Sequence, residues 1–524
     1  MEKESQENRS ESNQCIIHSE DKPYVLSSLK DGDIDYANTT GIGLMDKFFV
    51  FLSEIDFFKF VCPFYPNPRK RTGIPLHFLI STYLQLKLHV ENAFQNLPYL
   101  LNSATLLKTL GFNVGPKDGG FNHKNKKPRL CAADQDTVRK FFKDTDAEKL
   151  LSWYNRDVVA FFRSRKVFDP QGIFILDSSL LPLPDNPNYE NASWLPLDEN
   201  KKYVDVSRLT EEERKKLKNT LCYNLTTLLN VGFPDNYFIF SGIHLGPGKE
   251  SGLTQGEKII DDFIYNQGKG IIKTLLIDRG FIDGPMITRF KKEYHIDTVF
   301  PLRKNMDAYT DAFGIAKLPS IQWSTHSIEN DKDNKLKKKI ELALVPEVTI
   351  WQNCEVPLNV AIFKETKLKE ETNEYEINQR AIATTLKSCT ATQIYELYYR
   401  RTQIEERYDQ VKNYWNIYKF TSTSFNLATA QVVFILMAYS LLQIYLKNKN
   451  MQEYANRSLK KLKYREMMAG PPPVVVYKDR HFALFIFEEY QNIILNLEGE
   501  ALHRMRRKSR QTLQAHPPPD FFLR

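Results

Sequence analysis

Cysteine is scarce in this sequence, and so are long apolar runs. The six cysteines are scattered along 524 residues, and no two have the two-to-four-residue spacing of a zinc finger. Scattered cysteines in a long chain are typical of reduced thiols rather than of a disulfide framework. The first segment, MEKESQENRSESNQ, lacks the apolar stretch of a secretory signal. These absences favour a cytoplasmic protein.

No apolar run reaches membrane-spanning length. The most apolar one, VVFILMAYSLLQIYL at 432–446, has about 15 residues, whereas roughly 20 are needed to cross a bilayer. We therefore expect a buried core helix there and no membrane segment. Hydrophobic residues make up 42% of the chain, which allows sizeable cores. The net charge of +8 is a mild bias toward polyanions and decides little alone.

Segments of different composition follow one another along the chain. They are a polar segment predicted to be disordered (1–35), a helical one (36–167), one of alternating strands and helices (168–305), a strand-rich one (306–388), a second helical one (389–450) and a basic C-terminal one (451–524). Basic clusters at Lys70–Arg71, Lys124–Lys127 and 503–510 (HRMRRKSR) could grip DNA, but solvated loops or tails explain them equally well.

Two predicted strands each end in an aspartate. GIFILDSS places Asp177 after a run of buried-strand residues, and TLLIDRGF does the same for Asp278. A single aspartate in this place is usually a helix cap or a turn former. Two in one α/β segment are more suggestive, because ligand and catalytic groups gather beyond strand ends in open sheets.

The segment YELYYRRTQIEERYDQVKNYW is predicted to be one long helix. At roughly 100° per residue, Tyr398, Arg401, Glu405 and Lys412 fall on one face of it. An exposed face with an i, i+4 Arg–Glu pair is the more common explanation on spacing alone. The alternative is a phosphate-handling metal site, in which the acid holds a metal and the cations at either end hold phosphates.

These blocks together resemble the three catalytic blocks of DDE transposases of bacterial insertion sequences, the group with a Tyr-Arg-Glu-Lys signature. IFILDSS and LLIDRGF correspond to the two aspartate blocks, and Y-x2-R-x3-E-x6-K matches at all four positions. The resemblance implies an α/β fold with an RNase H-like mixed-sheet core (168–305 and 389–450), interrupted by a β-rich insertion (306–388). A helical N-terminal DNA-binding region (36–167) would precede the core.

The resemblance also implies an activity, a metal-dependent cleavage at transposon ends followed by strand transfer into target DNA. Hard oxygen ligands suit Mg²⁺ or Mn²⁺, and two such ions can serve an in-line displacement without a covalent protein–DNA intermediate. The partners would be terminal inverted repeats and target DNA, held by a homodimer in the nucleoid of a bacterial cytoplasm. The residues implied are Asp177, Asp278 and Glu405 as catalytic metal ligands, and Tyr398, Arg401 and Lys412 as contacts to DNA phosphates.

Other functions remain open at this point. A related metal nuclease would cut DNA without joining it, and a silenced transposase would bind DNA without cutting. A glycoside hydrolase also uses two carboxylates, but the basic helix face and only five tryptophans make it a poor fit.

Several other residues could have functional roles, but each also has a simpler structural explanation. Glu406 adjoins Glu405 and is expected to be a surface charge, and Asp409 is a weaker candidate for an accessory acid. His244, near a strand end, is expected to be structural. Trp323 and Trp351 in the insertion could stack on a flipped base, but core packing is the simpler expectation for both.

Overall fold

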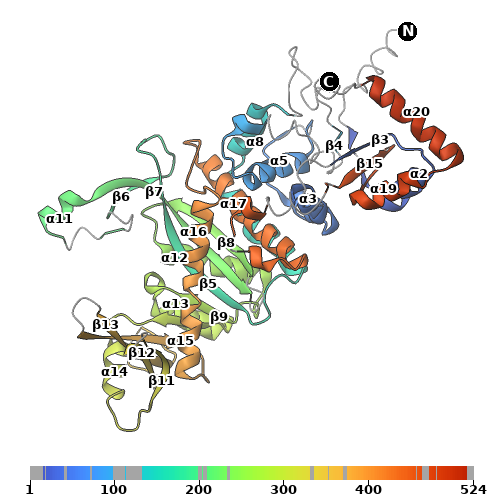
Figure 1. Ribbon diagram of the computed structural model, residues 1–524. Coiled ribbons are helices and arrows are strands. Elements are labelled where there is room, and N and C mark those ends of the chain that lie inside the picture. Colours follow the sequence, from blue (N-terminus) through green and yellow to red (C-terminus); the bar gives the residue numbers. More distant parts are fainter. Residues whose placement is uncertain are drawn as a thin grey trace. The chain divides into compact units, whose positions relative to one another are not determined.

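The computed structural model divides into two compact units. It describes residues 16–17, 19–39, 44–70, 73–97, 112–113, 133–198, 203–204, 209–232, 237–330, 336–351, 353–369, 374–455, 457–462, 471, 473–479 and 481–515. The first unit combines Met1–Asp146 with Asn456–Arg524, and the second is Ala147–Ala455. Both ends of the chain therefore belong to one unit (Figure 1).

A four-stranded sheet in the first unit is built from the two ends of the sequence. Its strands, in order, are β2 (Ser19–Glu20), β16 (His481–Phe485), β15 (Val474–Lys478) and β3 (Tyr36–Thr39). Helix α2 (Lys22–Lys30) buries Val25 and Leu29 in a cluster with Val474 and Phe485. The prediction of disorder for 1–35 is therefore wrong for this helix, because its apolar partners come from the far end of the chain.

Helices make up most of the rest of the first unit. They are α3 (Leu44–Glu54), α4 (Phe57–Val61), α5 (Leu76–Leu88), α8 (Gln135–Asp144), α19 (Phe487–Leu495) and α20 (Gly499–Ala515). From Phe78 onward, every residue of α5 is buried, which makes it the central helix of its neighbourhood. Helix α20 contains the basic cluster at 503–510 that sequence alone could not distinguish from a disordered tail.

The second unit is organised around a mixed sheet of ten strands. Its core strands are β5 (Ile173–Pro182), β6 (Ser193–Leu197), β7 (Lys218–Gly232), β8 (Tyr237–Pro247), β9 (Thr274–Ile277) and β10 (Asp297–Pro301). Strand β9 lies between β5 and β10 and is parallel to both, while β7 is antiparallel to β5 and to β8. The short parallel strand β9 (TLLI) is an almost continuous apolar run in which every residue is buried. This is typical of a parallel strand that is covered on both faces of its sheet.

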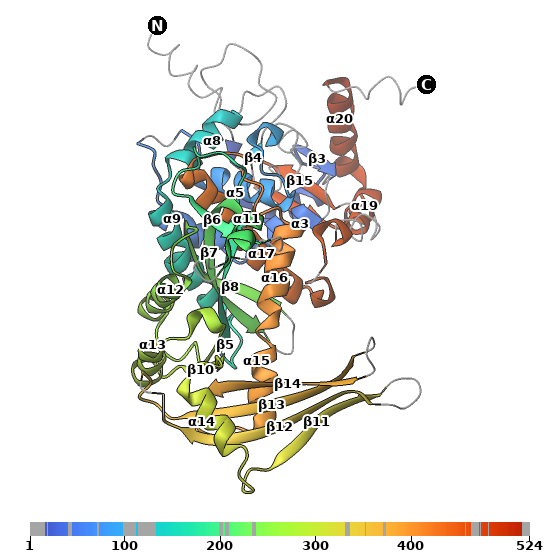
Figure 2. The same cartoon turned by 90° about the vertical axis from the view of Figure 1, so that its left-hand side faces the viewer.

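The segment expected to be strand-rich begins with a helix and then extends the same sheet. Its elements are α14 (Asp307–Ile315), β11 (Trp323–Asn330), β12 (Leu336–Val348), β13 (Leu358–Lys369) and β14 (Glu374–Thr384). The last residues of β14 pair with β10, so the four strands continue the core sheet in the order β10-β14-β13-β12-β11. Figure 2 shows these long strands side by side, with α14 packed against them.

Helices on opposite faces of the sheet can be identified from adjacent residues of β7, whose side chains alternate between faces. Thr226 bonds Gln255 of α12 (Gly252–Gln267), and Thr227 bonds Tyr408 on the other face. Helix α17 (Phe425–Asn448) contains the apolar run 432–446 and contacts β8. It is long and apolar enough to cross a membrane, but 94% of its most apolar window is buried within the protein.

Candidate active site

Asp177 and Asp278 are brought together by parallel strand pairing. The last pair in the register of β5 with β9 is Leu176 with Ile277, and each aspartate is the next residue of its strand. Asp278 lies at the end of β9, as predicted. Asp177 does not lie at a strand end, because β5 continues to Pro182 along its longer partner β7. The two aspartates are therefore neighbours across the sheet.

The segment carrying the four-residue signature is not one helix. It consists of α15 (Ala391–Tyr399) and α16 (Thr402–Asn413), with a break at Arg400 and Arg401. Thr390 begins α15 with a capping box, in which its side chain accepts from the Gln393 N–H. The prediction of a continuous helix was wrong here because no proline or glycine marks the break. The tight i→i+3 bonds across it keep the chain turning in the same sense.

Arg401, at the break, reaches all three acids. Its Nη1 lies 3.4 Å from Asp177 Oδ2 and 4.0 Å from Asp278 Oδ2, and its Nη2 lies 2.9 Å from Glu405 Oε1. The oxygens of Asp177 and Asp278 share one nitrogen, so their separation cannot exceed the sum of those first two distances. The structure thus gathers the three predicted acids around one guanidinium.

The three acids differ in how far water reaches them. The Asp177 side chain is 13% exposed, that of Asp278 is 40% and that of Glu405 is 58%. Arg401 itself is only 11% exposed, so Arg401 and Asp177 are nearly buried while Asp278 and Glu405 are open to water. Such a gradient suits a site that is anchored in the core and open to a large substrate on one side.

Burial raises the pKa of Asp177 to about 7, against the opposing effects of Arg401 and the Ser178 N–H. The nearby charges of Asp278 and Glu405 act in the same direction as burial. The reason is that a carboxylate in a poorly solvated place is less stable than the neutral acid, and two further negative charges add to this cost. In the absence of any other cation, Asp177 titrates near neutral pH.

This elevated pKa predicts a pH-dependent effect of Asp177→Asn on stability. A folded-state pKa above the unfolded value means that the folded protein binds more protons, so this group's stabilising contribution is lost as pH rises toward 7. The amide cannot ionise, so the variant should gain stability relative to wild type at pH 8, on the order of a few kcal/mol, and not at pH 4. Urea unfolding without divalent metal at both pH values measures this difference. An equal effect at both would contradict the assigned pKa.

Tyr398 and Lys412 flank the acids as the sequence pattern suggested. The Tyr398 ring lies beside the Arg401 guanidinium, 5.7 Å from its centroid. Lys412 Nζ donates to Ser179 Oγ at 2.8 Å, and Ser179 shares a face of β5 with Asp177. The signature residues therefore line the same side of the sheet as Asp177, despite the break in the helix.

Tyr408 is a site residue that sequence reasoning missed. Its buried hydroxyl donates to the Asp177 carbonyl oxygen at 2.9 Å and lies 2.8 Å from Thr227 Oγ1, which donates to it in turn. This fixes α16, and with it Glu405, to the centre of the sheet. The only sequence signal was its position three residues after Glu405, on an adjacent part of the helix surface.

Tyr408→Phe is expected to destabilise the protein by about 1–2 kcal/mol, because it leaves the buried Thr227 hydroxyl and Asp177 carbonyl without this partner. Thermal or urea unfolding measures the loss. A double-mutant cycle with Thr227→Val should show that the two changes are not additive. Additive effects would mean that the two hydroxyls do not act as one unit.

In the described part of the chain, Arg401 pairs with Asp177, Asp278 and Glu405, and Glu406, Asp409 and His244 are not among its ion-pair partners. Glu406 pairs with the buried Arg407 at 3.7 Å, and Asp409 is exposed on α16. His244 pairs with Glu250 at 3.3 Å. It is opposite Thr226 in the register of β7 with β8, so it lies on the α12 side of the sheet and not on the side of Tyr408. These positions support the choice of Glu405 from the signature register.

The two tryptophans of the strand-rich segment differ in burial, and the basic loops are only partly described. Trp351 packs against Phe300, as expected, but Trp323 is 39% exposed on the edge strand β11, so core packing was the wrong expectation for it. Lys70 lies in a described loop, whereas Arg71 and Lys124–Lys127 lie outside the described residues.

The donor set has the chemistry that Mg²⁺ or Mn²⁺ prefers, three carboxylates with two of them open to water. Among the described residues, no three Asp, Glu, His or Cys side chains are already drawn together tightly enough to hold a metal. At these acids the reason is visible, because the Arg401 guanidinium lies among them. The three acids thus favour a cation at this place, and a metal ion could bind them only if the Arg401 side chain moved out from among them.

Comparison with known proteins gives one clear finding. Residues 169–441 match the family model described as Transposase DDE domain, which spans the mixed sheet, the strand-rich segment and most of α17. No curated protein shows a significant match. The match contains Asp177, Asp278 and Glu405 together with the helices that position them.

Proposed function

Because the chain belongs to the transposase DDE domain family, we propose that it cuts DNA at the ends of a mobile element and joins the freed strand to target DNA. Membership in the family makes it a transposase, an enzyme that acts on DNA. The observation that supports cutting and joining at one site is the gathering of three acids, Asp177, Asp278 and Glu405, around the nearly buried Arg401 guanidinium. The Tyr-Arg-Glu-Lys pattern of Tyr398, Arg401, Glu405 and Lys412 supports assignment to the corresponding subgroup.

DDE transposases generally use divalent metal ions, and in this chain Asp177, Asp278 and Glu405 are the residues that would hold them. When bound, one or two Mg²⁺ or Mn²⁺ ions would supply Lewis acidity for attack on phosphorus. The buried Asp177 is the fixed point of the set, because its strand is held on both sides by β7 and β9. Glu405 is the adjustable one, since it is exposed and sits just after the break at Arg401.

The cations of α15 and α16 have the complementary role of positioning DNA. Arg401 can grip a phosphate through two parallel N–H donors, which a lysine cannot do. Lys412 beside Ser179 would place a point charge on a second phosphate. Tyr398 would support the Arg401 side chain by ring contact.

The proposed reaction sequence uses one site for both steps and needs no protein nucleophile. Water attacks the phosphodiester at the element end and releases a 3′ hydroxyl. That hydroxyl then attacks a phosphodiester of the target, breaking one P–O bond for each one formed. Two ends must be held together, so the proposed active form is a homodimer on DNA, acting in the bacterial nucleoid.

The test is an assay with labelled duplexes carrying the inverted repeats that flank the coding sequence, together with a circular target plasmid and Mg²⁺. The proposal expects cut ends and labelled strands joined to the plasmid. Cut ends without joined products would instead favour a nuclease, and binding without cutting would favour a silenced transposase.

A further inference from the structure

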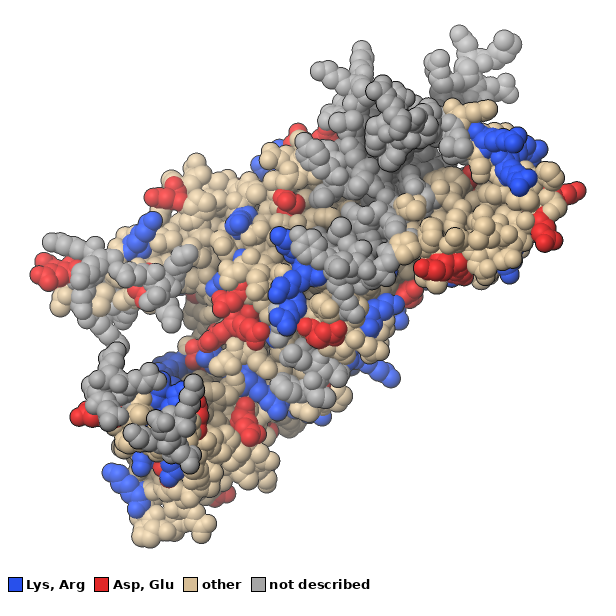
Figure 3. Space-filling view, in the orientation of Figure 1, with Lys and Arg blue, Asp and Glu red and all other residues tan. Residues whose placement is uncertain are grey.

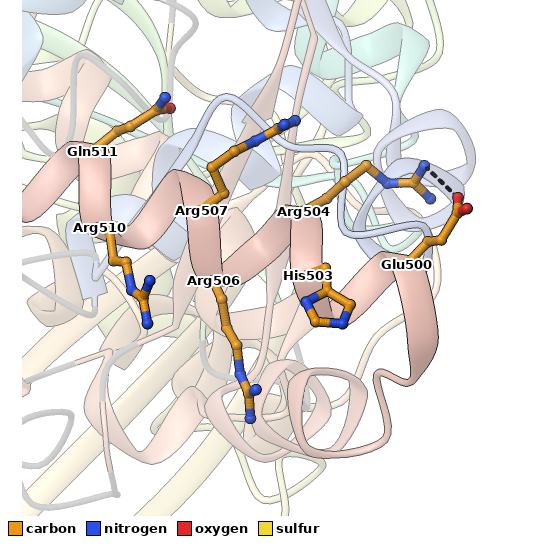
Figure 4. Close-up of a pocket in the computed structure, with 7 residues that line it drawn as sticks. All are labelled: Glu500, His503, Arg504, Arg506, Arg507, Arg510 and Gln511. Atoms are coloured by element: carbon orange, nitrogen blue, oxygen red, sulfur yellow. Dashed lines mark ion pairs between the residues drawn. The ribbon is translucent and has the colours of Figure 1, made fainter.

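Helix α20 carries its cations on two separate surfaces. His503, Arg506, Arg507 and Arg510 follow one another at helical spacing of three and four residues, and all four are exposed. Figure 4 shows Arg506 and Arg510 along one side of this face and Arg507 along the other. We call the surface formed by these four residues the α20 basic face.

Other residues of α20, on the sides next to and opposite this face, pack against the rest of the unit. Met505 joins the core cluster of the small sheet. Lys508 pairs with Asp33 at 3.1 Å, and Arg504 Nε donates to the Asp31 carbonyl oxygen at 2.9 Å. These contacts fix the rotation of α20 about its axis. The direction in which the basic face points is thus set by the fold, which is not so for a charged tail.

The arginines of the α20 basic face have no acidic partners in the part of the chain that the structure describes. Among the described residues that border the face, the acid is Glu500, which lies 3.6 Å from Arg504 and so is already paired. Figure 3 shows the resulting patch of Lys and Arg over α20. Three unpaired arginines on one fixed face repel one another unless an anion lies against them.

The spacing of the face fits a phosphate backbone. Arg506 and Arg510 are four residues apart, or about 6 Å along the helix axis. Successive phosphates of one DNA strand rise by about 3.4 Å, so the face spans two to three phosphates of a duplex. Arginine also binds phosphate oxygens bidentately, which makes it the suited cation for this contact.

We propose that the α20 basic face is a second DNA-contacting surface, one that holds duplex backbone without reading its sequence and is distinct from the acidic cluster. The proposal deepens the assigned function, since it rests on DNA being the substrate. Contacts to phosphates alone hold DNA in position and carry no base recognition. The face would therefore add affinity for flanking or target DNA of any sequence.

The experiment compares the full-length protein with the triple variant Arg506→Gln, Arg507→Gln, Arg510→Gln. A fluorescent duplex of arbitrary sequence is titrated at several salt concentrations. Loss of about three phosphate contacts should weaken binding by on the order of tenfold to a hundredfold at low salt. The slope of log binding constant against log salt concentration should become shallower by roughly 2–3. Far-UV circular dichroism and melting should be unchanged, because these side chains are exposed.

A matched control removes the same total charge elsewhere. Lys258, Lys269 and Lys317 are exposed and lie on different elements of the second unit. The triple variant Lys258→Gln, Lys269→Gln, Lys317→Gln therefore removes three charges that do not form one patch. The proposal expects this control to bind like wild type. If the two triple variants lose affinity equally, the effect is one of net charge and the α20 basic face is not a DNA site.

Two further arms separate the possible failures. Phosphatidylserine vesicles test a membrane surface as the partner, and loss of vesicle binding with intact duplex binding would overturn the proposal. Cleavage of element ends is followed in parallel. Wild-type protein that neither binds duplex nor cuts would contradict the assigned function itself, whereas normal cutting with unaltered duplex binding by the triple variant would contradict only the α20 proposal.

Discussion

Asp177→Asn, Asp278→Asn and Glu405→Gln are each expected to slow DNA cleavage by at least about a hundredfold. A metal-bound transition state gains several kcal/mol of charge stabilisation, and each 1.4 kcal/mol corresponds to a factor of ten in rate. Removing one of three carboxylates takes away a charged oxygen ligand, while the amide preserves the shape. The same result is expected for strand transfer, because the proposed mechanism carries out both steps at one site. Single-turnover assays on labelled element ends measure the rates.

The control for this series is Asp409→Asn. Asp409 lies on the same helix as Glu405, one turn further on, and is exposed. The Asp409→Asn substitution removes one carboxylate charge but leaves the three acids that contact Arg401 unchanged, so near-normal cutting is expected. DNA binding by the three active-site variants should match wild type in gel-shift assays. Normal cutting by Glu405→Gln, with loss in Asp409→Asn, would show that the third acid was assigned wrongly.

Arg401→Gln is expected to tighten Mn²⁺ binding in the absence of DNA, by about tenfold or more, while cleavage falls. The guanidinium lies 2.9–4.0 Å from the three acids and competes with a metal ion for them. At such distances a pair of unit charges near a protein surface interacts by about 4 kcal/mol, so the removal of one cation strongly favours another. Cleavage falls because the phosphate contact is lost. Isothermal titration calorimetry with Mn²⁺ measures the affinity.

Lys412→Gln is the matched control, since it removes a positive charge from the same helix but at Ser179. It should change Mn²⁺ affinity far less than Arg401→Gln does. Weaker Mn²⁺ binding in Arg401→Gln would contradict competition. It would mean that Arg401 holds the carboxylates in position for the metal.

The candidate site residues could be chosen from the sequence because each has a local pattern. Asp177 and Asp278 follow apolar strand runs, and they meet because β5 and β9 are parallel neighbours in the sheet. The sequence did not predict that pairing, since β6, β7 and β8 lie between the two strands in the chain. The break at Arg401 could not be predicted from the sequence, because no proline or glycine marks it. Tyr408 was missed because its partners lie on β5 and β7.

The first unit shows the limit of sequence reasoning more plainly. Helix α2 has a modest apolar face, and only its packing against strands from the C-terminal segment shows that Val25 and Leu29 belong to a core. The cluster HRMRRKSR gave no sign of being helical rather than disordered. What orders it is the docking of Met505 and Lys508 on α2 and its neighbours, a long-range contact that no local window contains.

The central claim is that three acids remote in sequence share divalent metal, and crystals grown with Mn²⁺ and element-end DNA test it most directly. Anomalous scattering at the manganese edge should place density within bonding distance of Asp177, Asp278 and Glu405, with the Arg401 guanidinium moved from among them to a phosphate. Manganese bound elsewhere, with Arg401 still paired to all three acids, would contradict the account.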